Sequence, residues 1–174
     1  LAMELLEGQH LADVVQDRGR LPVAEVRAIF DQLCHGVGAA HAAGIVHRDL
    51  KPENIFVARA KRRDVPFTVK VLDFGIAKWL HDADSASASQ LIGSPFWLAP
   101  EQADPSGGRI SPATDVWALG LIAFHLLTGK LFWLSSQLES PSVTQLLTEI
   151  LVHPIALASE RAAKLGVTEP LPEG

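Results

Sequence analysis

The sequence predicts an α+β fold that is mainly helical and contains one small β-hairpin. Two long segments, residues 22–43 and 112–127, carry apolar residues at helical spacing. Two short segments, residues 55–58 and 67–72, are rich in β-branched and apolar residues and predict the paired strands of the hairpin. Because helices come first, then the hairpin, then helices again, we expect a helical layer beside a small sheet.

The N-terminal part predicts the end of a strand followed by two helices. Residues 1–8 are largely apolar and run into a turn at Gly8. Residues 10–18 predict a short helix that Gly19 closes, and the next helix begins with Pro22, where a missing N–H is tolerated. Its apolar residues recur at three- and four-residue steps and predict one buried face: Val26, Ile29, Phe30, Leu33 and Val37.

The middle of the chain alternates between loops and the predicted hairpin. Residues 45–54 are polar and interrupted by Pro52, which predicts a loop. Residues 81–90 are small and polar and predict a second loop without a core of its own. A basic run lies between the two strands and predicts a solvated hairpin loop, with phosphate or partner binding as the alternative. The run consists of Arg59, Lys61, Arg62 and Arg63.

The C-terminal third predicts three helices, of which the first is central. Ser111 and Pro112 are typical of a helix start, and Gly129 of a helix end. The residues between them are apolar nearly all round, so we expect this helix to be covered on every side. Residues 142–152 and 156–165 predict two further helices.

Size and composition indicate one globular domain. The chain has 174 residues, 48% hydrophobic and 20% charged, with a net charge of −5 that argues against a general nucleic-acid or membrane-surface binder. Its one cysteine, Cys34, excludes an internal disulfide and is expected in the core of its helix. We find no secretory signal, and the longest apolar run, residues 116–127, is too short to span a bilayer. These observations favour a cytoplasmic location.

Two polar segments carry the groups that phosphoryl transfer requires. Residues 47–54 read His-Arg-Asp-Leu-Lys-Pro-Glu-Asn, and residues 73–75 read Asp-Phe-Gly. Together they supply carboxylates, an amine and an amide. Transfer from a nucleotide needs a carboxylate to orient a hydroxyl, oxygen ligands for Mg²⁺ and a cation near the moving phosphate.

These motifs resemble those of eukaryotic-type (Hanks-type) Ser/Thr protein kinases. Two further segments carry the resemblance: Gly-Ser-Pro-Phe-Trp-Leu-Ala-Pro-Glu at 93–101, similar to the end of an activation segment, and Asp-Val-Trp-Ala-Leu-Gly at 115–120. The resemblance is strong over residues 1–130 and looser over 131–174, and its details suggest a bacterial member. It implies the large (C-terminal) lobe of a protein kinase, with the N-terminal lobe absent.

The resemblance implies catalytic roles for four residues. Asp49 would orient the substrate hydroxyl and accept its proton, and Lys51 would place a positive charge over the transferred phosphate. Asn54 and Asp73 would bind Mg²⁺ (or Mn²⁺), with Asp73 bridging the metal to the β- and γ-phosphates of ATP.

It also implies an adenine site at the N-terminal end. Met3 would be the gatekeeper of the hinge between the lobes. Glu4 and Leu6 would contact adenine through their backbone, and Phe56 would form the apolar floor beneath it. His47 is expected to support the loop of residues 45–54 (the catalytic loop) rather than to act as a base.

Regulation is expected at the activation segment. In the family, the arginine at the position of Arg48 commonly receives an activation-loop phosphate, and Ser85, Ser87 and Ser89 lie where such a phosphate would be attached. An unmodified serine-rich linker is an equal alternative. Ser94 keeps the hydroxyl that bridges Asp49 and Lys51 in the family, although threonine is the usual residue there.

Two acids are expected to support the site. Asp115 would hold backbone amides of the catalytic loop. Glu101 would pair with a buried arginine from a later segment, and we find no candidate arginine in the sequence before Gly174. A buried charge without a partner costs roughly 3–5 kcal/mol, so we expect the isolated chain to be poorly stable or to self-associate.

The functional expectation is therefore a partial kinase catalytic domain over residues 1–174, truncated at both ends. The intact enzyme would transfer the γ-phosphoryl of Mg·ATP to Ser or Thr of a protein substrate. This piece alone would be inactive without the N-terminal lobe, because the glycine-rich loop and strand lysine over the phosphates are absent. A non-catalytic pseudokinase or truncated interaction scaffold is the alternative, and a small-molecule phosphotransferase is a weaker one.

Overall fold

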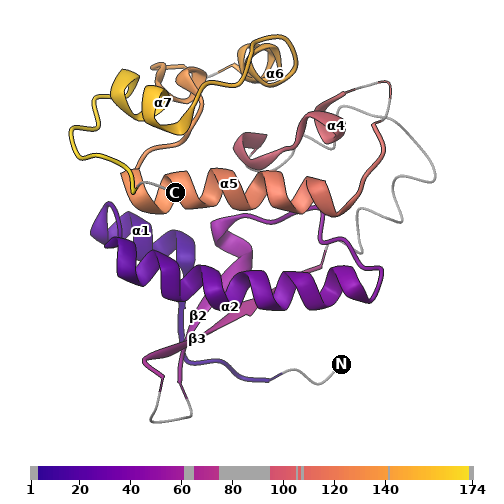
Figure 1. Cartoon of the computed structure of the whole chain (residues 1–174), viewed down its shortest axis with the longest axis vertical. Helices are drawn as coiled ribbons and strands as arrows, with labels where there is room; N and C mark the ends of the chain where they lie inside the picture. Colours follow the sequence, from indigo (N-terminus) through magenta and orange to yellow (C-terminus); the bar gives the residue numbers. More distant parts are fainter. Residues whose placement is uncertain are drawn as a thin grey trace.

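The computed structural model describes residues 4–60, 65–74, 95–104, 106, 108–140 and 142–172. A small sheet forms one end of the molecule, and helices are stacked in layers beside it (Figure 1). Helix α5 (Pro112–Thr128) runs through the middle, with α2 (Val23–Ala42) on one side and α6 (Val143–Leu151) and α7 (Ala158–Lys164) on the other (Figure 1). The predicted α+β fold with mainly helical content is confirmed.

The sheet has three antiparallel strands in the order β1-β2-β3. The predicted hairpin is confirmed as β2 (Ile55–Arg59) and β3 (Phe67–Val71), with Val57 opposite Val69. The third strand, β1 (Gly8–His10), pairs with β2, so Gly8 begins a strand instead of ending one. A side chain at this position would lie 2.1 Å from the carbonyl oxygen of Val57, which explains why glycine is required.

Helix α2 covers the outer edge of the sheet through a side-chain amide. Gln32 Nε2 donates to the carbonyl of Phe67 at 3.3 Å, and Gln32 Oε1 accepts from the N–H of Val69 at 3.0 Å. The amide thus replaces a neighbouring strand on β3, which protects an edge that would otherwise present unpaired backbone groups.

The first two helices match the sequence prediction closely. Helix α1 (Leu11–Arg18) ends at Gly19, whose φ is 76°, and the predicted apolar face of α2 is buried at Val26, Ile29, Leu33 and Val37. The expectation for Cys34 is wrong, because this side chain is exposed. One residue past a buried leucine is about 100° further round the helix, which turns the thiol away from the core.

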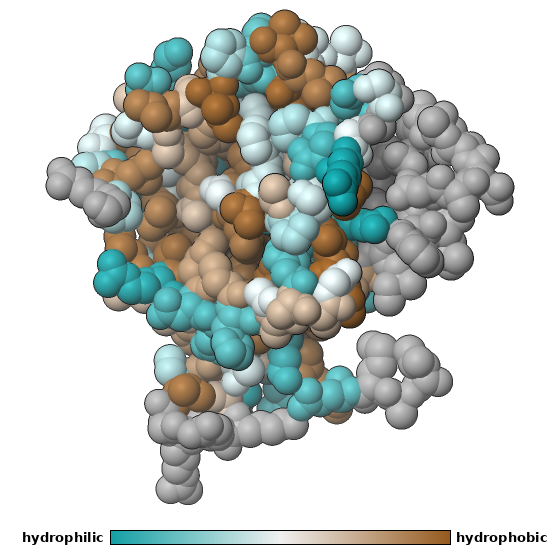
Figure 2. All heavy atoms as spheres, turned by 45° about the vertical axis from the view of Figure 1, so that its right-hand side comes forward, coloured by the Kyte–Doolittle hydropathy of each residue, from teal (hydrophilic) through white to brown (hydrophobic). Residues whose placement is uncertain are grey.

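Helix α5 has the predicted ends but is not covered on every side. Ser111 caps it, and Gly129 ends it in the left-handed conformation with a φ of 69°. However, Val116 is 60% exposed, and apolar side chains also reach the surface elsewhere on the molecule (brown in Figure 2). A groove of ≈ 370 Å³ beside α5 is lined by mainly apolar residues, including Trp117 and Ile155.

Short elements complete the helical part. They are η1 (Pro52–Asn54), η3 (Pro95–Trp97), α4 (Pro100–Ala103) and η4 (Leu134–Gln137). The predicted helices at 142–152 and 156–165 are confirmed as α6 and α7. One continuous apolar core joins all the helical layers, with Leu11, Ile29, Leu50, Ile122 and Leu146 among its most buried members.

Several predicted positions lie outside the described residues. They are Met3, Lys61, Arg62, Arg63, Gly75, Ser85, Ser87, Ser89 and Ser94. Among the helices of the described part, none has both the length and the apolar character needed to cross a membrane.

Candidate active site

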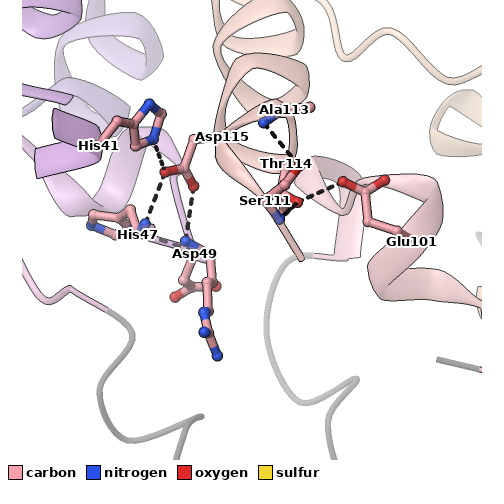
Figure 3. A network of polar contacts seen from close by, with 9 residues as sticks. His41, His47, Asp49, Glu101, Ser111, Ala113, Thr114 and Asp115 are labelled. Atoms are coloured by element: carbon pink, nitrogen blue, oxygen red, sulfur yellow. Dashed lines mark hydrogen bonds and ion pairs between the residues drawn. The ribbon is translucent and has the colours of Figure 1, made fainter. Parts of the chain in front are cut away.

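The loop before η1 is held by the buried carboxylate of Asp115. Its Oδ1 accepts the backbone N–H of Arg48 at 2.8 Å, and its Oδ2 accepts the backbone N–H of His47 at 2.8 Å (Figure 3). His41 Nε2, from α2, lies 2.7 Å from the same Oδ2. The predicted role of Asp115 in holding backbone amides of this loop agrees with these contacts.

The start of α5 explains why Asp115 points at the loop. Ser111 caps the helix by accepting from the N–H of Ala113, and Pro112 occupies the first helical position. Asp115 therefore falls in the first turn, where an acidic side chain is also favoured by the helix dipole. The capped helix start fixes where the carboxylate lies, and the carboxylate in turn fixes the loop.

The loop backbone is strained at Arg48. This residue has a φ of 69°, a left-handed conformation that non-glycine residues rarely adopt. Such conformations cost about 1–3 kcal/mol and persist only when surrounding contacts hold them, and they are concentrated at functional sites. The Asp115 carboxylate is one of those contacts.

His47 lies at the centre of the loop and is only 1% exposed. Its Nε2–H donates to the carbonyl of Leu72 at 2.9 Å, and its Nδ1 accepts the N–H of Asp49 at 3.2 Å. The ring also lies against Phe74, with 4.8 Å between the centroids. Because both ring nitrogens already have partners, this geometry agrees with a supporting role for His47 and not with a role as a base.

The structure brings together three of the predicted catalytic residues. Lys51 Nζ lies 3.3 Å from Asp49 Oδ2. Asn54 Nδ2 donates to the Asp49 carbonyl at 2.8 Å and to its Oδ2 at 3.1 Å. These bonds orient the Asn54 amide so that its oxygen is the atom left to bind a ligand.

The turn that carries Asp73 is attached to the same loop. The Leu72 N–H donates to the carbonyl of Asn54 at 2.8 Å, which continues the β2–β3 ladder by one residue. Its carbonyl accepts from His47, so Asp73 follows directly after two anchored backbone groups. Asp73 is exposed and has a φ of 50°.

The donor groups suit Mg²⁺ that is bound jointly by protein, phosphates and water. They suit a metal ion bound only by protein side chains less well. Asp73 offers a carboxylate and Asn54 an amide oxygen, which are ligands that hard cations prefer. Within the described ranges, no group of three or more His, Cys, Asp or Glu side chains is arranged to hold a metal ion. Mg²⁺ at nucleotide sites is usually bound by one or two protein groups together with phosphates and water, so the residues fit such an ion.

The predicted adenine residues lie at the sheet end of the molecule. Glu4 Oε2 lies 3.4 Å from Lys70 Nζ on β3, and Leu6 is half-buried. Phe56, on β2, makes an edge contact with His10 at 5.1 Å between centroids. Phe56 lies two residues after Asn54, on the strand that follows the catalytic loop.

A groove of ≈ 440 Å³ lies beside the catalytic loop. It is lined by residues of α1, η1, η3 and α5, including Glu53, Trp97 and His125. The His125 ring packs edge-on against Trp97, with 5.6 Å between centroids, and its burial lowers the pKa of the imidazole below the ordinary value of 6.5.

Glu101 differs from the sequence-based expectation. It is half-buried and accepts a hydrogen bond from Thr114 Oγ1 at 2.5 Å, so the expectation of a buried charge without a partner is wrong. The chain does contain a buried arginine, Arg161, but its Nη1 lies 2.6 Å from Glu149 Oε1. Sequence reasoning missed this arginine because nothing in its local pattern indicates burial.

Sequence reasoning also missed His41. It lies 74 positions before Asp115, at the end of α2. The sequence pattern of this helix predicts only its buried apolar face. The sole signal was a polar residue in the last turn of α2, and such residues are usually solvated.

Comparisons with known proteins identify the family of the chain. The protein kinase domain family matches residues 1–165. Serine/threonine-protein kinase Pkn1 of Myxococcus xanthus is 47% identical over 133 residues, which cover 75% of this chain and 18% of that protein. Serine/threonine-protein kinase PknL of Mycobacterium tuberculosis is 37% identical over 129 residues, covering 74% of this chain and 30% of that protein.

The chain therefore belongs to the protein kinase domain family. Its similarity to the Myxococcus and Mycobacterium proteins supports a bacterial Hanks-type Ser/Thr kinase, as the motifs predicted. The chain spans less than a third of the length of these relatives.

Proposed function

We propose that the protein carrying this chain transfers the γ-phosphoryl of Mg·ATP to Ser or Thr hydroxyls of a protein substrate. We further propose that the chain supplies the large lobe of the catalytic domain. The observation that carries the proposal is the arrangement of Asp49, Lys51 and Asn54 around one loop, with the turn of Asp73 anchored to it.

In the proposed reaction, Asp49 accepts a hydrogen bond from the substrate hydroxyl and takes its proton as the oxygen attacks the γ-phosphorus. The bond between that phosphorus and the β–γ bridging oxygen breaks, and ADP leaves. Lys51, which lies 3.3 Å from Asp49, places a positive charge beside the transferred group. Asp49 is 28% exposed, so the carboxylate is accessible to a hydroxyl.

Asp73 and the amide oxygen of Asn54 would hold Mg²⁺ on the nucleotide phosphates. When bound, the ion neutralises charge that develops on the phosphate oxygens. Asn54 has a second role, because its Nδ2 donates to Asp49 Oδ2 and so holds the carboxylate. Glu4, Leu6 and Phe56 would hold adenine at the sheet end, and the groove beside Glu53 and Trp97 would receive the acceptor peptide.

We also propose that the activation segment regulates the site as its family resemblance implies. A phosphate on Ser85, Ser87 or Ser89 would be bound by Arg48, whose backbone conformation is the strained part of the loop. Ser94 would bridge Asp49 and Lys51.

The test is a transfer assay with the full-length protein, [γ-³²P]ATP, Mg²⁺ and myelin basic protein, followed by phosphoamino-acid analysis. We expect label on serine or threonine, and a loss of about 10²–10⁴-fold in kcat for Asp49→Asn because a general base contributes that much. Asp17→Asn, on the exposed surface of α1, is the matched control. A protein that binds ATP but transfers no phosphate would be the pseudokinase or scaffold instead.

A further inference from the structure

Gln102 connects the end of the activation segment to the catalytic loop. Its Oε1 accepts the backbone N–H of Ala99, at the start of α4, at 3.1 Å. Its Nε2 donates to the backbone carbonyl of Arg48 at 2.7 Å, across 54 positions of sequence. The Ala99 N–H requires an acceptor and the Arg48 carbonyl requires a donor, so these two partners determine the orientation of the Gln102 amide.

The carbonyl of Arg48 belongs to the peptide group that leads into Asp49. A bond to this oxygen therefore fixes the plane that carries the Cα atom of Asp49. On the other side of Arg48, the N–H is bound by Asp115 at 2.8 Å. The left-handed Arg48, with its φ of 69°, is thus held at both of its backbone polar groups.

These contacts close a ring that includes both α4 and α5. Glu101, next to Gln102, accepts from Thr114 at 2.5 Å, and Thr114 precedes Asp115 on α5 (Figure 3). Gln102 completes the ring back to Arg48. The space that Gln102 and Asp115 line has a volume of only ≈ 10 Å³, so these side chains pack closely against the loop.

We propose that Gln102 is a positioning residue for Asp49, and that it couples the segment 95–103 to the geometry of the catalytic loop. The proposal rests on the proposed phosphoryl transfer. A shift of α4 would withdraw the Nε2 donor from the Arg48 carbonyl. The Arg48 carbonyl would then lose this donor, and the backbone that leads into Asp49 would be less firmly held, although Asn54 and Lys51 would still contact the Asp49 carboxylate.

The simpler role for Gln102 is to cap α4 by binding the Ala99 N–H. Two substitutions separate the roles. Gln102→Glu keeps an oxygen for Ala99 but replaces the donor to Arg48 by an acceptor, whereas Gln102→Ala removes both contacts. If only the cap mattered, Gln102→Glu would behave like the wild type.

The experiment measures kcat, the KM for ATP and hydrogen exchange of residues 47–49 in the full-length kinase. We expect kcat to fall about three- to tenfold in Gln102→Ala, the range for the loss of the hydrogen bond to the Arg48 carbonyl. We expect a loss of about tenfold or more in Gln102→Glu, because two acceptors then face each other. The KM for ATP should be unchanged in both, and amide exchange at 47–49 should be faster than in the wild type.

Gln137→Glu is the matched control, because Gln137 is exposed and donates only to the neighbouring Ser136 hydroxyl among the contacts of the described residues. Wild-type kcat and wild-type exchange in Gln102→Glu would overturn the proposal. If the wild-type protein transferred no phosphate, the proposed function would fail, and the exchange measurement would still decide the coupling. Faster exchange would support the coupling, and unchanged exchange would refute it.

Discussion

Asp115 and Glu149 are two buried carboxylates that each bind backbone N–H groups of a neighbouring segment, in different parts of the molecule. Asp115 is 1% exposed and accepts the N–H groups of His47 and Arg48, with His41 beside it. Glu149 is 7% exposed and accepts the N–H groups of Leu134 and Ser135, with Arg161 beside it.

What differs is the loop that each acid holds. The loop that Asp115 holds is strained and carries Asp49, whereas η4, which Glu149 holds, carries none of the residues predicted for catalysis. In addition, the partner of Glu149 is the buried guanidinium of Arg161, whose Cζ lies 4.7 Å from the centroid of the Phe132 ring. We therefore expect Asp115 to act mainly on turnover and Glu149 mainly on stability.

The largest expected effect is that of Glu149→Ala on stability. The substitution leaves Arg161, 5% exposed, without its carboxylate, and breaking a buried pair costs about 3–5 kcal/mol. Denaturant unfolding of the full-length kinase should show this loss, while kcat well below the unfolding temperature stays within about threefold of the wild type. Glu160→Ala, on the exposed side of α7, is the control. A loss of kcat as large as that in Asp115→Ala would break the distinction.

Of the two buried acids, Asp115 should have the larger effect on turnover when it is replaced by alanine. The substitution leaves two backbone N–H groups without their acceptor, at about 1–3 kcal/mol each, and releases the strained Arg48 peptide. We expect kcat to fall about 10²-fold, which corresponds to about 2.7 kcal/mol. Steady-state kinetics at saturating ATP measures the effect. A variant with wild-type kcat would show that the loop holds its geometry without Asp115.

His41→Ala should have a smaller effect on turnover. The variant keeps both amide contacts of Asp115 and loses only the contact of 2.7 Å that orients the carboxylate. One hydrogen bond to a charged group suggests a loss of about tenfold in kcat. His35→Ala, exposed on the same helix, is the control. Equal losses in His41→Ala and Asp115→Ala would mean that the carboxylate has no role of its own.

The smallest effect is on the pH dependence of stability. Burial alone would raise the pKa of Glu149, but hydrogen bonds from Ser135, Leu134 and Arg161 outweigh it, so the pKa lies below its ordinary value of 4.5. Because the folded state then takes up a proton less readily than the unfolded state, Glu149 stabilises the fold above pH 4.5, and this is lost as the pH falls through the lowered pKa.

Glu149→Gln has no such proton to take up. Its unfolding free energy should fall less steeply than that of the wild type as the pH is lowered below 4.5. Thermal unfolding at several pH values measures this, with Glu160→Gln as the control. Parallel curves for wild type and Glu149→Gln would contradict the lowered pKa.

The two acids also show what the sequence can and cannot predict. Asp49, Lys51 and Asn54 are close in the chain, so a local motif predicts their chemistry, and Asp115 was found through a second motif. The helices and the hairpin were predictable because their apolar spacing and end signals are local. The partners of the site were not, because His41 and Gln102 reach it from 74 and 54 positions away.

The errors have the same physical origin. Glu149 and Arg161 meet only after α6 and α7 pack together, and an isolated charged residue is usually solvated. Cys34 was misplaced because the expectation followed from the apolar stretch around it, whereas the thiol lies one residue past Leu33 and therefore outside the buried face. The exposed part of α5 was missed because apolar residues predict burial but do not identify the segment that would bury them.

The central claim is that Asp73 and Asn54 come together on one metal ion beside Asp49. A crystal structure of the full-length kinase with Mg²⁺ and a non-hydrolysable ATP analogue tests it directly. We predict a carboxylate oxygen of Asp73 and Oδ1 of Asn54 on the same Mg²⁺, each at about 2.0–2.1 Å. A metal–nucleotide complex in which Asp73 points away from the ion, on the opposite side of the loop from Asn54, would contradict the assignment.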